Sequence, residues 1–302
     1  MITSKEHTDT LFESFCKNKE IEKYMFIIEG LIIDRPHKKV RLTDEHDKGI
    51  DFNNEKYLSY KHRFNGMLID VISIFKRTDL QVKYEDLDGN PFIYALKNQN
   101  NNPNEWRFDI TDEEVYRYIR RFLTICKSID KEYDTIIMVP SSHSINRRFM
   151  DVIFKQVKAT NKVEDMFYKT RKVDAYNSRD LAAIEKYALK KCNHNYMTAM
   201  NLEEKIIDRI EDCFDSMSGN YFKASQMDKE YIRFIRRIVT PNNKYTLEKA
   251  SELIRGKRVL VLDDTLSTGV TISSCVENIQ RYGPSKLQVI TLLSKKMKSD
   301  KL

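Results

Sequence analysis

Two adjacent carboxylates, Asp263 and Asp264, end a short apolar run and precede a turn that is rich in small hydroxyl residues. An apolar strand without alternation is typical of a parallel sheet that is covered on both faces. In open α/β sheets, ligands bind beyond the carboxyl ends of the strands. We therefore expect the two acids to accept hydrogen bonds from sugar hydroxyls or to attract a magnesium ion, which prefers oxygen ligands.

The turn that follows the acids offers donors for a phosphate group. Gly269 permits positive φ or close backbone approach. The helix predicted after it would present unpaired N–H groups and the positive end of its dipole. The hydroxyl side chains of the turn are Thr265, Ser267, Thr268 and Thr271. An isolated Ser-Thr-Gly would more simply cap a helix, but carboxylates beside a phosphate cradle at this spacing describe a ribose 5-phosphate site.

A second segment, 134–148, combines a strand with a polar and basic loop. Its apolar run ends at Pro140 and predicts a strand. The residues after it supply N–H groups, hydroxyls and cations, which suit a pyrophosphate. The candidate side chains are Ser141, Ser142, His143, Ser144, Arg147 and Arg148. A solvated surface position is the alternative for His143 and Arg147, and it is the preferred interpretation of Arg148.

Both segments resemble motifs of the type I phosphoribosyltransferases. LVLDDTLSTGVT (260–271) is similar to their motif for 5-phosphoribosyl 1-pyrophosphate (PRPP), and 134–148 is similar to their pyrophosphate loop. The motif layout is closest to the ComF-like group, and the resemblance covers roughly 134–190 and 257–294. Val270 departs from the pattern, because many members have a second glycine or another small residue there.

The resemblance implies a role for each of these residues. Asp263 and Asp264 would hold the ribose hydroxyls and would contact Mg²⁺ only indirectly, through those hydroxyls or water. Arg147 would join them in catalysis by holding the pyrophosphate. The other PRPP- and phosphate-binding residues would be Thr265, Ser267, Thr268, Gly269, Thr271, Ser141, Ser142 and His143. A mobile loop over the diphosphate would use Lys169, Arg171 and Lys172, for which a solvated basic turn is the simpler interpretation.

The same resemblance implies an α/β fold with an open parallel sheet flanked by helices. It also implies a glycosyltransferase that moves ribose 5-phosphate with Mg²⁺ as cofactor and pyrophosphate as leaving group; the acceptor stays open. Two alternatives stay open as well. One is a non-catalytic regulator that binds PRPP or a nucleotide. The other is a transferase-like effector of a mobile-element or antiviral defence system, controlled by a protein or nucleic-acid partner.

The elements that must position these motifs follow from hydrophobic periodicity. A strand is predicted over 23–34, a helix over 60–77, a loop over 97–105, a helix from Thr111 to Ile129, a strand over 134–140 and a helix after Ser144. Further along, we expect a strand over 162–169, a helix capped by Ser178 that runs to Cys192, helices between 200 and 255 including 231–238, a strand over 258–263, a helix that ends near Gly283 and a strand over 287–293.

These elements divide the chain into an N-terminal mixed region, 1–105, and a core, 106–302, with a helical insertion at about 193–256. The N-terminal region is a candidate hood or partner-binding part. A protein or nucleic-acid partner would bind through that region or the insertion, and a homodimer is left open.

Composition narrows the class of protein. The 302 residues are 41% hydrophobic and 32% charged, without an apolar run long enough to span a membrane. The net charge of +7 favours anionic partners only weakly. Five scattered cysteines without a CxxC pair suggest neither disulfides nor a zinc site. We expect a cytoplasmic protein that does not bind membranes.

Overall fold

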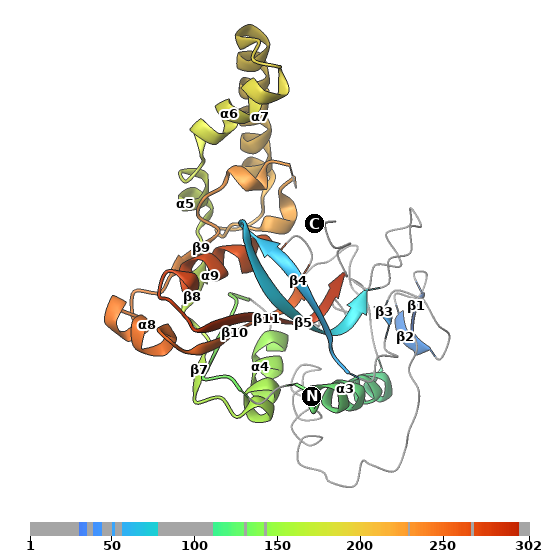
Figure 1. The fold of residues 1–302 in the computed structure, drawn as a ribbon. Helices are drawn as coiled ribbons and strands as arrows, with labels where there is room; N and C mark the ends of the chain where they lie inside the picture. The colour runs from blue at the N-terminus through green and yellow to red at the C-terminus, as the bar shows by residue number, and fades with distance from the viewer. Residues whose placement is uncertain are drawn as a thin grey trace.

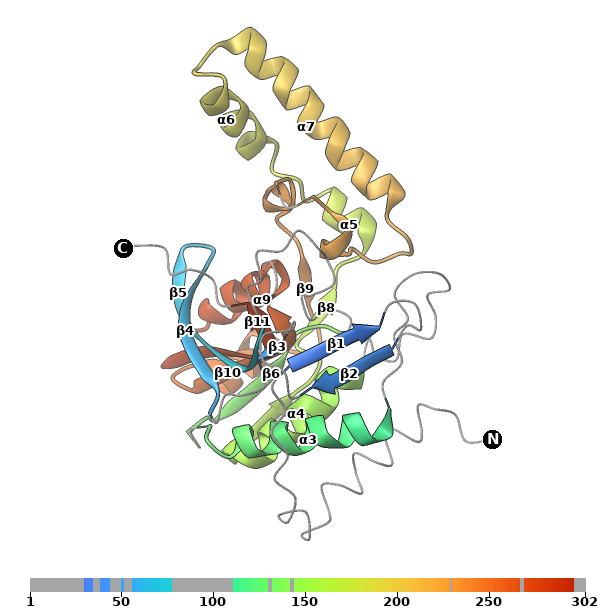
Figure 2. The same cartoon turned by 90° about the vertical axis from the view of Figure 1, so that its right-hand side faces the viewer.

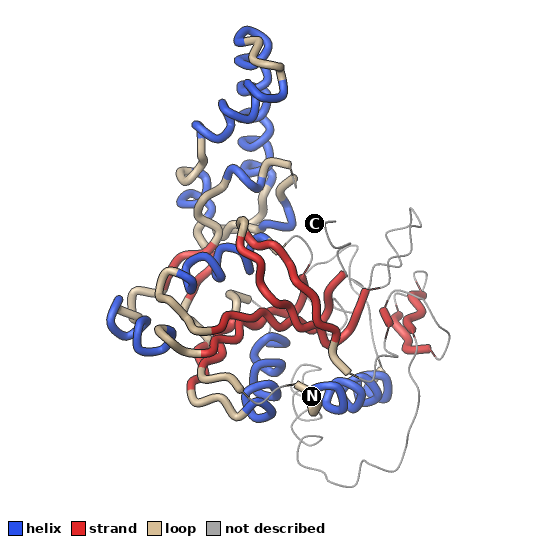
Figure 3. The backbone as a smooth tube through the Cα atoms, in the orientation of Figure 1, coloured by secondary structure: helices blue, strands red, loops and turns tan. Residues whose placement is uncertain are grey.

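The computed structural model describes residues 30–34, 39–43, 50–51, 56–77, 111–129, 132–141, 144–228, 230–266 and 269–295. Within them, a largely parallel seven-stranded sheet is flanked by helices, as Figures 1 and 3 show, so the predicted fold class is confirmed. The strands are β1 (Gly30–Asp34), β2 (Lys39–Thr43), β3 (Ile50–Asp51), β4 (Leu58–Phe64), β5 (Met67–Arg77), β6 (Thr135–Met138), β7 (Asn161–Val163), β8 (Phe167–Lys169), β9 (Val239–Pro241), β10 (Arg258–Leu266) and β11 (Lys286–Lys295). The helices are α3 (Asp112–Cys126), α4 (Ser144–Val157), α5 (Lys172–Tyr176), α6 (Leu181–Lys191), α7 (Tyr196–Ser216), α8 (Leu247–Ile254) and α9 (Val270–Gln280), with 3₁₀ turns η3 (Ala224–Gln226) and η4 (Ile232–Phe234).

Strand β10 lies in the middle of the central sheet. The strand order is β3-β5-β11-β10-β6-β7, with β4 also paired to β5. Strands β5, β11, β10, β6 and β7 are parallel, whereas β3 and β4 run antiparallel to β5. The carboxyl ends of β10 and β6 therefore meet at one edge, and the two segments that the sequence analysis singled out follow these two strands.

Two hydrophobic clusters cover the two faces of the sheet. Helices α3 and α4 pack with Leu260 and Leu262 of β10, and α9 packs with Val259 and Val261 of the same strand. This coverage explains why 259–262 is apolar without alternation. The predicted helices at α3 and α4 are confirmed, as are the predicted strands at β6, β10 and β11.

The segment 60–77 is a β-hairpin, so the helix predicted there is wrong. Strands β4 and β5 pair from Leu58 opposite Ser73 to Phe64 opposite Met67. The turn between them is Asn65-Gly66, and both residues have positive φ, at 45° and 86°. Asn-Gly is the preferred pair for such a two-residue hairpin turn. The apolar residues of β5 imitate helical spacing because residues 71–75 are buried on both faces of the strand.

Three further predictions need correction. The strand predicted over 162–169 is two short strands, and only β7 joins the central sheet, while β8 pairs with β9. The helix predicted over 231–238 is η4 followed by extended chain. Asp180 rather than Ser178 caps α6. The Ser178 hydroxyl instead donates to the carbonyl of Ala175 and accepts from the N–H of Arg237.

The structure describes parts of the predicted N-terminal region and of the predicted insertion. Strands β3, β4 and β5, from the predicted N-terminal region, belong to the central sheet. The boundary at residue 105, the loop 97–105 and the beginning of the strand predicted over 23–34 lie outside the described residues. Among the helices that are described, none is long and apolar enough to cross a membrane.

Helices α6 and α7 form an arm that projects away from the sheet, as Figure 2 shows. Ile206, Ile210 and Phe214 are buried along α7, as predicted for one face of a helix. At its distal end, Tyr196 and Met197 are more than two thirds exposed. The arm therefore presents an unusual apolar tip to solvent.

Replacing the cap of α6, Asp180→Ala, is expected to lower the free energy of unfolding by about 1 kcal/mol. The Asp180 carboxylate accepts from the N–H of Ala183 at 3.1 Å and pairs with Arg236 at 2.7 Å. Urea denaturation measures the loss. Asp180→Asn keeps the cap and should retain most of the stability, because an ion pair whose cation is largely exposed contributes little. Asp208→Ala, on the exposed face of α7, is the neutral control. An equal loss in the Asn variant would contradict the cap as the cause.

Candidate functional site

The two acids lie at the carboxyl end of the central strand. Strand β10 continues through them to Leu266, three residues beyond its predicted end. Asp264 is 7% exposed, and Asp263 is half-buried. Burial raises the pKa of Cys275 in α9 well above its ordinary value, and the charge of Asp263 raises it further, so this carboxylate lies close to α9.

Asn146 joins the two predicted segments. It lies in the first turn of α4, is fully buried, and donates from Nδ2 to Oδ1 of Asp263 at 3.0 Å. The same carboxylate oxygen accepts from the backbone N–H of Asp264 at 2.9 Å. Asn146 is not among the residues predicted from the sequence, where the cations and hydroxyls of this loop are the candidates. Its position in the first turn after a buried strand, at the edge where the acids lie, was the available signal.

Several buried oxygens at this edge have no hydrogen-bond partner among the described residues. They are Oδ1 of Asn146 and Oγ1 of Thr265 and Thr291, whereas the buried hydroxyls of Ser294 and Tyr60 lie near each other. In the pairing of β10 with β11, Thr291 lies opposite Asp263 and Ser294 lies opposite Leu266. Because a buried polar atom without a partner is costly, such a group of atoms indicates a polar ligand or water.

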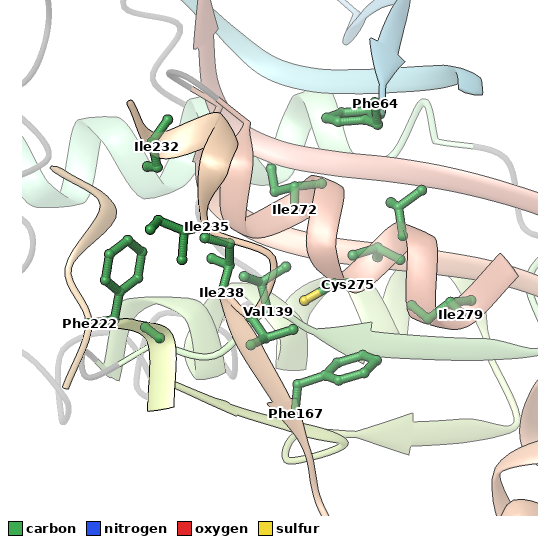
Figure 4. Packing of buried hydrophobic residues seen from close by; sticks show 14 of the residues in the cluster. Phe64, Val139, Phe167, Phe222, Ile232, Ile235, Ile238, Ile272, Cys275 and Ile279 are labelled. Atoms are coloured by element: carbon green, nitrogen blue, oxygen red, sulfur yellow. The ribbon is translucent and has the colours of Figure 1, made fainter. Parts of the chain in front are cut away.

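The phosphate turn begins α9 with a glycine. Gly269 has φ of 71° and is the N-cap of the helix, so no side chain caps it. That arrangement leaves the first N–H groups for another acceptor and argues against a simple hydroxyl cap at this position. A Cβ on Gly269 would lie 2.9 Å from Cδ1 of Leu266 and 3.2 Å from Cε1 of Phe64. Figure 4 shows Phe64 on β4 beside Ile272 of α9.

The structure describes only some of the other predicted site residues. Thr265 is the penultimate residue of β10, Thr271 lies in the first turn of α9, and Ser141 follows β6 and is half-buried. The predictions for Ser142, His143, Ser267 and Thr268 fall outside the described residues. The site roles of all these residues stay predictions.

Arg147, the cation predicted to hold the pyrophosphate, pairs with an acid that follows β7. Arg147 is 66% exposed and donates to Glu164 at 2.8 Å. Partial burial raises the pKa of Glu164, but the cations of Lys162 and Arg147 outweigh it and hold that pKa below its usual value. Burial lowers the pKa of Arg148.

The basic stretch after β8 also has partners. Arg171 pairs with Asp174 at 2.9 Å, and Nζ of Lys172 donates to the carbonyl of Met217 at 3.3 Å. Lys169 ends β8. The closure of this basic stretch over a diphosphate stays a prediction.

No cluster of three or more His, Cys, Asp or Glu side chains suited to a metal occurs in the part of the chain that the structure describes. The two adjacent carboxylates and the carbonyl oxygen of Asn146 are nevertheless hard oxygen donors, the kind that Mg²⁺ prefers. Magnesium fits this donor set if a ligand and water supply most of its coordination.

Comparison with known proteins gives one family. The model of the phosphoribosyl transferase domain matches residues 220–301. The match includes the acids, the turn and α9, and it begins inside the segment that the sequence analysis treats as an insertion. No curated protein matches the chain. The likeness to the ComF-like group, which rests on 134–190 as well, stays a prediction.

Proposed function

From the chain's membership of the type I phosphoribosyltransferase superfamily, we propose that it binds PRPP and transfers its ribose 5-phosphate to an acceptor, with pyrophosphate as leaving group. The observation that supports this most is the contact of Asn146 with Asp263. It ties the loop predicted for pyrophosphate to the acids predicted for ribose, beside a helix that begins with a bare glycine cap.

The chemistry asks for placement and charge neutralisation more than for a protein nucleophile. Departure of pyrophosphate leaves positive character on the ribose ring and negative charge on the leaving group. Asp263 and Asp264 would accept from the ribose hydroxyls and so fix the ring, while Asn146 holds the Asp263 carboxylate in place. The N–H groups at the start of α9 would bind the 5-phosphate. Magnesium, when bound, would neutralise the pyrophosphate, held by substrate oxygens and indirectly by the two acids.

Pyrophosphate release from PRPP and Mg²⁺ with a panel of bases, amines and water tests the proposal. Release that depends on one acceptor supports it. Binding of PRPP without pyrophosphate release with any acceptor would favour a sensing role instead. So would an Asp263→Asn/Asp264→Asn variant whose turnover equals that of the wild type.

Arg147→Ala is expected to lower pyrophosphate release about 10- to 100-fold, the effect of one charge-assisted hydrogen bond to a leaving group. The side chain is 66% exposed and can exchange Glu164 for a pyrophosphate. Lys162→Ala removes the other cation on Glu164 and is the matched control. If both substitutions lower release equally, Arg147 acts through its surface ion pair with Glu164 and does not bind the leaving group.

A second candidate function is a PRPP- or nucleotide-binding effector or regulator that is controlled by a partner. The arm tip favours it, because Tyr196, Met197 and Met200 are 71%, 74% and 64% exposed. Residues 186–202 contain three lysines and no acidic residue, whereas 203–215 contain six acidic residues and two basic ones. The tip therefore suits a protein partner with an apolar surface and an acidic rim. A partner that changes pyrophosphate release in the wild type but not in a Met197→Asp/Met200→Asp variant would support this function.

A further inference from the structure

Strand β4 brings a histidine to the head of α9. Along the strand, His62 and Phe64 are half-buried and buried, whereas their neighbours Lys61 and Arg63 are exposed. A Cβ on Gly269 would lie 3.5 Å from Nε2 of His62, beside the ring of Phe64. The imidazole thus lies next to the glycine cap, although it is about 200 residues away in the sequence.

The surroundings hold this imidazole in place. Its ring packs edge-on against Phe64, with ring centroids 4.4 Å apart and an interplanar angle of 73°. On the same strand, burial raises the pKa of Tyr60, and the nearby Ser294 hydroxyl partly offsets the rise. Ser294 is 1% exposed, and its hydroxyl lies near that of Tyr60. Strand β4 therefore contacts α9 and carries Tyr60 beside the buried hydroxyl of Ser294.

We propose that His62 binds the 5-phosphate of the substrate, donating from Nε2 of a protonated imidazole to a phosphate oxygen at the head of α9. The inference rests on the proposed function and names one more residue of the same site. A phosphate monoester loses its second proton near pH 6, close to the usual histidine pKa of about 6.5. The bound dianion should stabilise the imidazolium, with the proton taken from solvent.

Other titratable groups lie on the elements that surround β4. On β5, Asp70 is half-buried and lies 3.9 Å from the exposed Lys61. On α9, Glu277 pairs with Arg281 at 2.9 Å and accepts from Asn65, and Cys275 is buried with a raised pKa. On β10, Asp263 and Asp264 are the acidic side chains at the carboxyl end of the strand. The ligand-dependent change in the His62 pKa is therefore the informative quantity.

The affinity for phosphate should depend on pH through His62. Phosphate binding should raise the His62 pKa, so the contribution of His62 to affinity is complete below the free-state pKa. It is lost as the pH rises through the raised pKa of the complex. In His62→Gln, the affinity should vary with pH only through the titration of the ligand and of the other groups.

The test uses the full chain and ribose 5-phosphate as the probe, with PRPP and Mg²⁺ as a second ligand. NMR of the histidine rings should show the His62 pKa rising by about one unit on saturation, equivalent to about tenfold tighter binding to the protonated form. His62→Gln should weaken ribose 5-phosphate binding about tenfold at pH 6 and much less at pH 8.5. His194→Gln, on the exposed turn of the arm, is the matched control and should change neither.

The outcomes separate this inference from the proposed function. If the wild type binds both ligands but its His62 pKa does not move, or His62→Gln binds equally well at pH 6, the role of His62 is wrong and the proposed function stands. If the wild type binds neither ligand at millimolar concentration, the proposed function is wrong and the inference falls with it. The pKa measurement on the wild type stays decisive even if the variant unfolds.

Discussion

Replacing both acids, Asp263→Asn with Asp264→Asn, is expected to lower PRPP affinity and pyrophosphate release about 10²- to 10⁴-fold. Each carboxylate would accept from a ribose hydroxyl, and a hydrogen bond to a charged group contributes about 1.5–3 kcal/mol. An asparagine at 263 can still accept from Asn146 and from the N–H of residue 264, so the local structure should survive. Isothermal titration with PRPP and Mg²⁺, together with a pyrophosphate assay, measures the loss.

The matched control for this variant is Asp134→Asn. Asp134 lies at the opposite end of the same sheet, where Oδ2 accepts from the N–H of Arg258 at 2.8 Å. It should affect stability without weakening PRPP binding. If the double variant releases pyrophosphate at the wild-type rate, the acids do not hold the ribose. If the control loses binding equally, the loss reflects general destabilisation.

Gly269→Ala is the second large effect, with an expected loss of about 2–4 kcal/mol in the free energy of unfolding. Positive φ costs an ordinary residue about 1 kcal/mol. The new Cβ would also lie 2.9 Å from Leu266 and 3.2 Å from Phe64, and overpacking of this kind costs about 1–3 kcal/mol more. Urea denaturation measures the change in stability, and PRPP affinity should fall with it, because the turn must shift.

Gly219→Ala separates the two contributions. Gly219 has φ of 80°, but nothing lies within 4 Å of a Cβ built on it. Its replacement should cost only the backbone term, about 1 kcal/mol. Equal losses for the two glycines would mean that the space at the head of α9 is not tight, and that Leu266 and Phe64 move aside.

Much of the core could be predicted because its signals are local. Strands β6 and β10 are short apolar runs bounded by polar residues, and α3 has one apolar face, so periodicity alone finds them. The acid pair and the glycine turn could be found for the same reason. Their neighbours in sequence are also their neighbours in space.

Long-range features escaped prediction. The hairpin at 60–77 was missed because apolar spacing in β5 outweighed the Asn65-Gly66 turn signal. Consequently His62, which reaches α9 only through the curl of that hairpin, could not be assigned to the site. The pairing of Arg147 with Glu164 joins α4 to the end of β7, and nothing in the local sequence indicates it.

A crystal structure of the protein with PRPP and Mg²⁺ tests the central claim most directly. We predict the ribose hydroxyls within hydrogen-bond distance, about 3 Å, of the Asp263 and Asp264 carboxylates. The 5-phosphate should lie at the first turn of α9. A ligand bound elsewhere on the chain, or a turn at Gly269 that stays filled by protein side chains at saturating PRPP, would contradict the account.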